Sequence, residues 1–161
     1  MLPEDEALEL TYFRDAMETD RNPKEMVLLE EFVVKFWFKA MYTPEMIFFE
    51  RIGGQMKFEA QNGKYILTID FGVLLYEAKS AELTIPLGEW THVLIVFEPG
   101  ERAFVYMNED LVINEELESQ HQNFVQSENN FLIGKGVGLM KDFVIYNNTL
   151  NDYRYLKEIM H

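Results

Sequence analysis

The stretch Glu31–Ala40, EFVVKFWFKA, contains the pattern that decides the fold. Its alternate residues separate into two faces when it is read with a period of two. One face is wholly apolar and consists of Phe32, Val34, Phe36 and Phe38. The other face is mixed and consists of Val33, Lys35, Trp37 and Lys39. The stretch therefore predicts a β-strand with one face in a core and the other toward solvent, where the lysine stems cover the body of the tryptophan.

Further runs of strand length recur at short intervals and are separated by turn residues. They are ALELTYF (7–13), MIFFERI (46–52), QMKFEA (55–60), YILTID (65–70), GVLLYEA (72–78), AELTI (81–85), THVLIVF (91–97), RAFVYM (102–107), DLVIN (110–114), NFLIG (130–134) and KDFVIY (141–146). The breaks at 53–54, 61–63, 98–101 and 108–110 have the residue types of hairpin turns. The pattern predicts an all-β chain in which neighbouring strands pair antiparallel.

So many short strands cannot form one open sheet, because its apolar face would stay wet, so we expect two sheets packed face to face. The residues expected between the sheets are Phe32, Val34, Phe36, Phe38, Val93, Ile95, Phe97, Phe143 and Ile145. Those expected on the opposite face of THVLIVF are His92, Leu94 and Val96. Near the end of the chain, Thr149 or Asn151 can cap a short helical turn through DYRYLKEIM, and residues 23–30 fit either helix or extended chain.

Length and composition indicate one domain over residues 1–161. A chain of 161 residues, 48% of them apolar, can bury a substantial core, and it shows no internal repeat or linker. The absence of cysteine excludes disulfides, thiolate-bound zinc and a cysteine nucleophile.

The charge and the hydropathy of the chain limit the classes of partner that it can bind. The formal net charge of −14 argues against nucleic acid and anionic lipid surfaces and favours neutral or cationic partners, although solubility alone also explains it. No apolar run is long enough to span a bilayer, so we expect no membrane insertion. The acidic start MLPEDEALEL lacks the features of a signal peptide. We therefore expect either a cytoplasmic protein or a domain cut from a longer chain.

Three stretches together resemble the laminin G-like domains of the concanavalin A-like lectin and glucanase superfamily. They are EFVVKFWFKA (31–40), GEWTHVLIVFEPGERAFVYMNEDLV (88–112) and NNFLIGKGVGLMKDFVIYNNTLNDYRYLKEI (129–159). The resemblance implies a jelly roll of two curved antiparallel sheets. It also implies a binding module more often than an enzyme.

The chain departs from the family pattern at two places. The hairpin that usually carries Asn-Gly has Asn108–Glu109, so we expect a wider turn in which Asn108 or Asp110 supplies any left-handed conformation. Before the last strand, where an acidic pair is often found, the chain has Lys141–Asp142, so we expect Asp142 to be structural.

The sequence gives no sign of catalysis. Glucanases of the superfamily carry two glutamates and an aspartate alternating on one strand, and no strand here has that arrangement. The acidic groups 4–6 and 115–118 fit solvated surfaces, and His92, His121 and His161 are scattered. The segment 134–138, GKGVG, fits a tight connection between strands better than a phosphate-binding loop. We therefore expect no enzyme activity, and a hydrolase stays open only if a carboxylate pair assembles from distant strands.

A calcium ion is the one cofactor that the resemblance implies, because modules of this family commonly hold calcium on their rim loops. The candidate oxygen donors are Asn108, Asp110, Asn129 and Asn130. The same residue types are also common in turns for conformational reasons alone, so a purely structural role stays open.

Two functional classes remain, and they need different surfaces. The first is a protein-interaction or structural module that docks through a sheet face or rim within a larger assembly. The alternative is a lectin-like, glycan-binding module, for which Trp37 and Tyr106 are the candidate aromatic platforms. Burial of those two side chains is the competing interpretation, since a large aromatic residue on a strand is usually packed.

Overall fold

The computed structural model describes residues 7–14, 17–18, 32–41, 43–51, 55–72, 75–118 and 131–146. In that part of the chain, no helix is long and apolar enough to cross a membrane. The strands found there are β1 (Ala7–Arg14), β2 (Met17–Glu18), β3 (Phe32–Ala40), β4 (Met46–Arg51), β5 (Met56–Gln61), β6 (Lys64–Asp70), β7 (Leu75–Lys79), β8 (Trp90–Glu98), β9 (Arg102–Met107), β10 (Asp110–Glu116), β11 (Phe131–Lys135) and β12 (Gly138–Tyr146).

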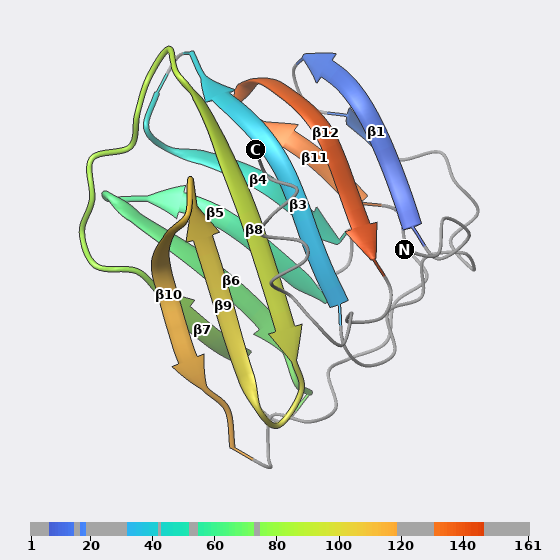
Figure 1. Cartoon of the computed structure of the whole chain (residues 1–161), viewed down its shortest axis with the longest axis vertical. Helices are drawn as coiled ribbons and strands as arrows, with labels where there is room; N and C mark the ends of the chain where they lie inside the picture. Colours follow the sequence, from blue (N-terminus) through green and yellow to red (C-terminus); the bar gives the residue numbers. More distant parts are fainter. Residues whose placement is uncertain are drawn as a thin grey trace.

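These strands form two antiparallel sheets that lie one behind the other (Figure 1). The front sheet has the order β1-β12-β3-β8-β9-β10, and the back sheet has the order β2-β11-β4-β5-β6-β7. Successive hairpins connect β4 to β7 and β8 to β10, while β12 inserts between β1 and β3. The all-β, two-sheet sandwich expected from the sequence is confirmed.

Phenylalanine rings from both sheets fill the space between them. The ring of Phe36 on β3 lies 5.7 Å from that of Phe48 on β4 and 5.5 Å from that of Phe143 on β12. Every residue that alternation placed between the sheets is buried in this one cluster. Because rings of opposite sheets touch directly, neither sheet can keep its inner face dry without the other.

The outer face of the front sheet differs from the expectation. Val33, Leu94 and Val96 are only 1%, 0% and 1% exposed, although alternation placed them toward solvent. The run from Val93 to Phe97 is continuously apolar, which is typical of a strand buried on both faces rather than on one. The assignment of the inner face was therefore correct, and the solvent exposure of these outer residues was wrong.

Two further expectations about strands need correction. Residues 81–85 form no strand, because Ala81 to Thr84 are exposed and the backbone N–H of Leu83 is held by the Gly63 carbonyl, at an N···O distance of 2.6 Å. The two-residue strand β2 was not expected, since so short a segment has no periodicity to detect. The expected C-terminal helical turn, residues 23–30 and His121 lie outside the described residues.

The β9–β10 hairpin is tighter than the sequence predicted. Asp110 pairs with Met107, so only Asn108 and Glu109 form the turn. Their φ angles are 46° and 78°, which is the combination required by a type I′ turn. The expectation of a wider turn was wrong, and Glu109 rather than Asp110 shares the left-handed conformation with Asn108.

The last strand contains a β-bulge, where the register with β3 shifts between Lys141 and Val144. Asp142 lies in this bulge with φ of 54° and an exposed side chain. The bulge lets Phe143 point into the core while Lys141 stays on the outer face. Asp142 therefore lies at the bend of the bulge, and segment 134–138 is the tight connection that links β11 to β12.

The contacts of Phe36 predict a large loss of stability on truncation. We expect Phe36→Ala to lower the free energy of unfolding by about 3 to 5 kcal/mol, because it removes a fully buried ring and leaves a cavity. Phe36→Leu fills most of that space, so its loss should be about 1 kcal/mol. Urea denaturation of both variants measures the difference. A loss below about 1 kcal/mol for the alanine variant would contradict the core assignment.

The turn predicts a stabilising substitution. We expect Glu109→Gly to raise the free energy of unfolding by about 0.5 to 1 kcal/mol, because glycine adopts the left-handed conformation without steric cost. Asn108→Gly is the matched control. It removes the side-chain oxygen that accepts a hydrogen bond from the His92 N–H at 2.8 Å, so it should bring no gain. Thermal unfolding of the two variants tests this, and equal effects would contradict it.

Candidate functional site

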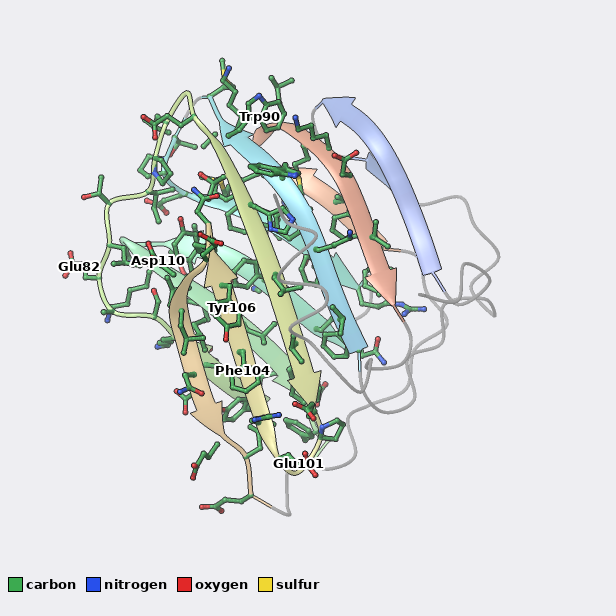
Figure 2. The ribbon with its side chains drawn as sticks, viewed as in Figure 1. Glu82, Trp90, Glu101, Phe104, Tyr106 and Asp110 are labelled. Carbon is green, nitrogen blue, oxygen red and sulfur yellow. The ribbon has the colours of Figure 1, made fainter. Side chains whose placement is uncertain are left out.

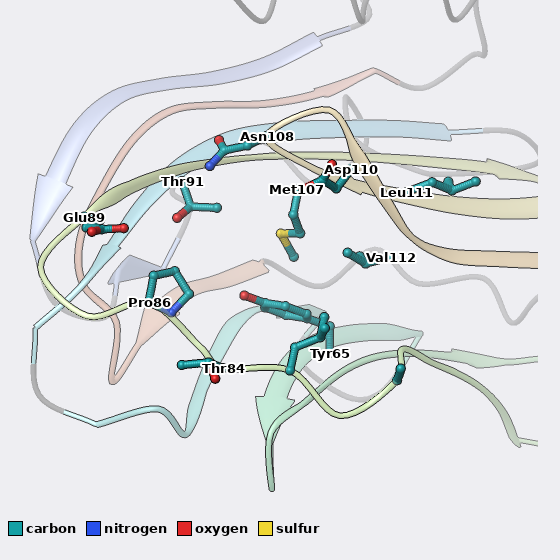
Figure 3. Close-up of a pocket in the computed structure, with 12 residues that line it drawn as sticks. Tyr65, Thr84, Pro86, Glu89, Thr91, Met107, Asn108, Asp110, Leu111 and Val112 are labelled. Carbon is teal, nitrogen blue, oxygen red and sulfur yellow. The ribbon is translucent and has the colours of Figure 1, made fainter.

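A pocket opens at one end of the sandwich, between the segment after β7 and the β9–β10 hairpin (Figure 3). Its volume is about 460 Å³, which is in the range of small-molecule sites. We call it the rim pocket, and its lining residues are Tyr65, Ala81, Leu83, Thr84, Pro86, Glu89, Thr91, Met107, Asn108, Asp110, Leu111 and Val112. Because Tyr65 and Met107 belong to the buried core, the pocket is an opening at the end of the space between the sheets.

Tyr65 on β6 supplies one wall of the rim pocket. Its ring is stacked on Phe58 with a centroid distance of 6.1 Å, and its backbone N–H donates to the Ser80 hydroxyl at 2.9 Å. The side chain is only 3% exposed, and burial raises the pKa of Tyr65 to about 12. Its hydroxyl points into the pocket (Figure 3), and among the described residues it has no hydrogen-bond partner. The pocket therefore contains a polar group that no described residue satisfies and that is open to solvent.

Thr91 supplies a second buried hydroxyl. It is the second residue of β8, pairs with Phe38 of β3, and is 4% exposed. The described part of the chain offers no hydrogen-bond partner to its hydroxyl either. A hydroxyl is both a donor and an acceptor, so Tyr65 and Thr91 together offer a ligand two groups of each kind.

Carboxylates and apolar side chains surround these hydroxyls. Glu89 and Asp110 are exposed at the mouth, and none of the lining residues is a lysine or arginine. Leu83 and Leu111 are large apolar side chains that are 38% and 45% exposed beside the opening. Figure 2 shows Asp110 on the same flank as Glu82, which adds further negative charge there. The rim pocket thus combines an electronegative mouth with an apolar collar.

The structure brings two of the four candidate calcium donors to this mouth. Asn108 and Asp110 both line the rim pocket, but the side-chain oxygen of Asn108 already accepts the hydrogen bond from the His92 N–H. Asn129 and Asn130 lie outside the described residues. Within the described ranges, no three His, Asp or Glu side chains are arranged so that they could hold a metal ion. The engaged amide of Asn108 fits a turn residue better than a metal ligand.

The two candidate aromatic residues lie elsewhere, on the outer face of the front sheet. Trp37 is partly exposed, and its ring packs edge-on against His92 at 4.9 Å. Tyr106 is 8% exposed and lies on β9 beside Phe104 (Figure 2). Strand β8 separates the two strands that carry them. They therefore share a face but neither contributes to the rim pocket.

The structure adds partners to Trp37 that sequence reasoning missed. The Lys141 ammonium lies 5.6 Å from the ring centroid of Trp37 and 4.5 Å from that of Trp90. Lys39 lies 6.0 Å from Trp90 as well. These cation–π contacts engage both indole rings with charges of the same chain, which makes them poorer platforms for a ligand.

Most residues of the rim pocket also escaped sequence reasoning, Asn108 and Asp110 being the exceptions. Tyr65, Glu89 and Thr91 belong to segments that were assigned to ordinary strands or turns. Their only signal is that hydroxyl and carboxylate residues stand at the ends of buried strands. That signal has no meaning until the pairing of distant strands is known.

Comparisons with known proteins agree with the sandwich. The sequence profile Laminin_G_3, described as "Concanavalin A-like lectin/glucanases superfamily", matches residues 18–153. No curated protein sequence gives a significant match. Among solved structures, the binding domain of Paraclostridial Mosquitocidal Protein 1 is similar with a TM-score of 0.74 at 10% identity, over 99% of this chain and 46% of that one.

Two structures of the botulinum neurotoxin DC binding domain are also similar, both at 14% identity with TM-scores of 0.62. One, in complex with rat synaptotagmin II, matches 82% of this chain and 36% of its own length. The other, in complex with SialylT, matches 81% of this chain and 35% of its own. The chain thus spans less than half the length of the structures that it resembles. At these identities the similarity shows the fold alone.

The buried hydroxyl of Tyr65 predicts a pH dependence of stability. The pKa of Tyr65 is raised to about 12, whereas in the unfolded chain the group ionises near 10. The neutral hydroxyl therefore makes its full contribution to the free energy of unfolding below about pH 10, and this contribution is lost as the pH rises toward 12. Between about pH 9 and pH 11.5 the wild type should lose about 2 kcal/mol more than Tyr65→Phe. Urea denaturation measures this, and identical pH profiles would contradict it.

Proposed function

Because this chain belongs to the concanavalin A-like lectin/glucanases superfamily, we propose that it is a non-catalytic binding module within a larger protein. Residues 1–161 are taken as a single domain of the jelly-roll type, which fits the uninterrupted family match over residues 18–153. A place within a larger protein fits the similar solved structures, whose chains are more than twice as long as the part matched. The net charge of −14 favours a neutral or cationic partner over nucleic acid.

The rim pocket is the observation on which this function rests. Binding sites are concave and mostly apolar, with a few polar groups that fix the orientation of the ligand. The rim pocket has this composition, with two buried hydroxyls at its walls and two carboxylates at its mouth. Trp37 and Tyr106 have less support as ligand contacts, since one indole is engaged by Lys141 and the phenol ring is buried.

A hydrolase is the competing class, because the fold brings two carboxylates from distant segments to one pocket. Glycoside hydrolysis needs one carboxyl that stays protonated near neutral pH, and enzymes achieve this by burying it. Glu89 and Asp110 are both exposed, so neither has the buried position that such an acid occupies. The buried ionisable neighbour is Tyr65, whose pKa is raised to about 12, which is too high for a general base at neutral pH. The lining therefore supports binding without turnover.

The kind of partner has two candidates. A protein partner that docks at the rim is supported by the exposed leucines around the pocket, and one similar solved structure is a complex with synaptotagmin II. A glycan is the second candidate, supported by the unsatisfied hydroxyls of the pocket, and another similar structure is a complex with SialylT.

Incubation with polysaccharides tests the absence of catalysis. A panel of β-glucans and related polysaccharides should give no new reducing ends in the presence of the protein, even at high protein concentration and long incubation. Glu89→Gln and Asp110→Asn are the matched variants. Turnover that appears with the wild type and disappears in either variant would show a hydrolase and overturn the binding-module function.

A further inference from the structure

We propose that the rim pocket binds an uncharged sugar residue of a glycan, through the buried hydroxyls of Tyr65 and Thr91 and the carboxylates of Glu89 and Asp110. This inference rests on the glycan-binding candidate described above and assigns its site and ligand class. It also moves the contact away from Trp37 and Tyr106, on the outer face of the front sheet.

The two buried hydroxyls point to a ligand that both donates and accepts hydrogen bonds. Tyr65 and Thr91 are 3% and 4% exposed, and no described residue satisfies their hydroxyl groups. Neither oxygen is sealed from solvent, so both are open to the pocket, where water or a ligand hydroxyl can bind them. An amine or guanidinium only donates, and it would leave both hydroxyl hydrogens without an acceptor. A sugar hydroxyl can accept from one group and donate to the other.

The carboxylates at the mouth determine which sugars fit. Glu89 and Asp110 accept hydrogen bonds and have no lysine or arginine among the residues that line the pocket with them. They can accept from the hydroxyls of a neutral sugar. A carboxylate, sulfate or phosphate on the ligand would instead meet two negative charges with no compensating cation. The pocket should therefore reject uronic and sialic acids.

The apolar side chains that line the pocket suit the C–H face of a sugar ring. Met107 and Pro86 lie on opposite sides of the opening, with Val112 beside Met107 (Figure 3). These side chains offer contact to C–H groups while the polar edge of the ring faces the hydroxyls. The volume of about 460 Å³ and the open mouth fit one residue at the end or within a chain rather than a long groove.

A panel of methyl glycosides tests the proposal in the full chain. The neutral probes are the methyl glycosides of glucose, galactose, mannose, fucose and N-acetylglucosamine, and the acidic probes are those of glucuronic acid and N-acetylneuraminic acid. Saturation-transfer NMR detects weak binding, and calorimetric titration gives the affinity. We expect binding of at least one neutral probe and of neither acidic probe. Binding confined to acidic probes, or binding of no probe, overturns the proposal.

Three variants locate the site, each compared with a matched control. Tyr65→Phe and Thr91→Val remove one hydroxyl each, and each should weaken binding of the neutral probe about fivefold to tenfold. Glu89→Gln changes an exposed side chain and cannot act through misfolding, and it should weaken binding as well. Tyr106→Phe removes a tyrosine hydroxyl on the outer face of the front sheet and should leave the affinity unchanged. Melting temperatures confirm that each variant is folded.

The outcomes separate this inference from the binding-module function. If the neutral probe binds but its affinity falls with Trp37→Ala and not with Tyr65→Phe or Glu89→Gln, the site is on the outer face and the rim pocket is wrong, while glycan binding stands. If no sugar binds and a protein partner is found, the inference fails and the binding module stands. Release of reducing ends would overturn both.

Discussion

The contact of phenylalanine rings across the two sheets is the constraint on which the rest of the molecule depends. Phe36 and Phe143 come from the front sheet, and Phe48 and Phe49 come from the back sheet. The ring centroids of the other three residues lie within 6.3 Å of the ring centroid of Phe36. Interiors are packed to crystal-like density, so rings of this size fix the separation and the register of both sheets. The position of the rim pocket follows from this packing. The pocket forms where the layer of phenylalanine rings ends, and there Tyr65 and Thr91 present hydroxyl groups.

The two surfaces that carry polar and aromatic groups differ in their charged side chains. The rim pocket has carboxylates at its mouth, whereas the Trp37 face has the ammonium groups of Lys39 and Lys141 on its indoles. In a chain with a net charge of −14, those lysines place positive charges on this face. Each is engaged by a ring of the chain itself, so the cluster stabilises the junction of β3, β8 and β12. The rim pocket, by contrast, holds two hydroxyls that have no hydrogen-bond partner among the described residues.

Much of the fold could be predicted from the sequence, and much of the site could not. Alternation in β3 identifies the inner face because Lys35, Trp37 and Lys39 interrupt it, but β8 is apolar on both faces, so alternation is silent about Leu94 and Val96. The type I′ turn was missed because Glu109 is a rare residue at a left-handed position. These errors are local, because in each case the type of a residue does not indicate whether it is buried or which backbone conformation it adopts.

The site was missed for a different reason. Tyr65, Thr91 and Asp110 come together only after β6, β8 and β10 have taken their places in two different sheets. The spacing of these residues along the chain does not predict that they come together, because a pocket between two sheets depends on the pairing of strands that are distant in the sequence. Turn chemistry singled out Asn108 and Asp110 as candidate calcium donors, but it gave no sign of Tyr65 or Thr91.

The hydroxyl of Tyr65 is the detail that packing alone does not explain. Its ring lies among Phe48 and Phe58, stacked on the latter with an interplanar angle of 9°, and a phenylalanine would fill the same space. The chain uses phenylalanine at thirteen other positions, so a preference for aromatic volume does not require the oxygen. Burial of the ring raises the pKa of Tyr65 to about 12, while the oxygen itself stays open to the rim pocket. An oxygen in that position can bind water or a ligand hydroxyl, which is the physical reason to look for a ligand there.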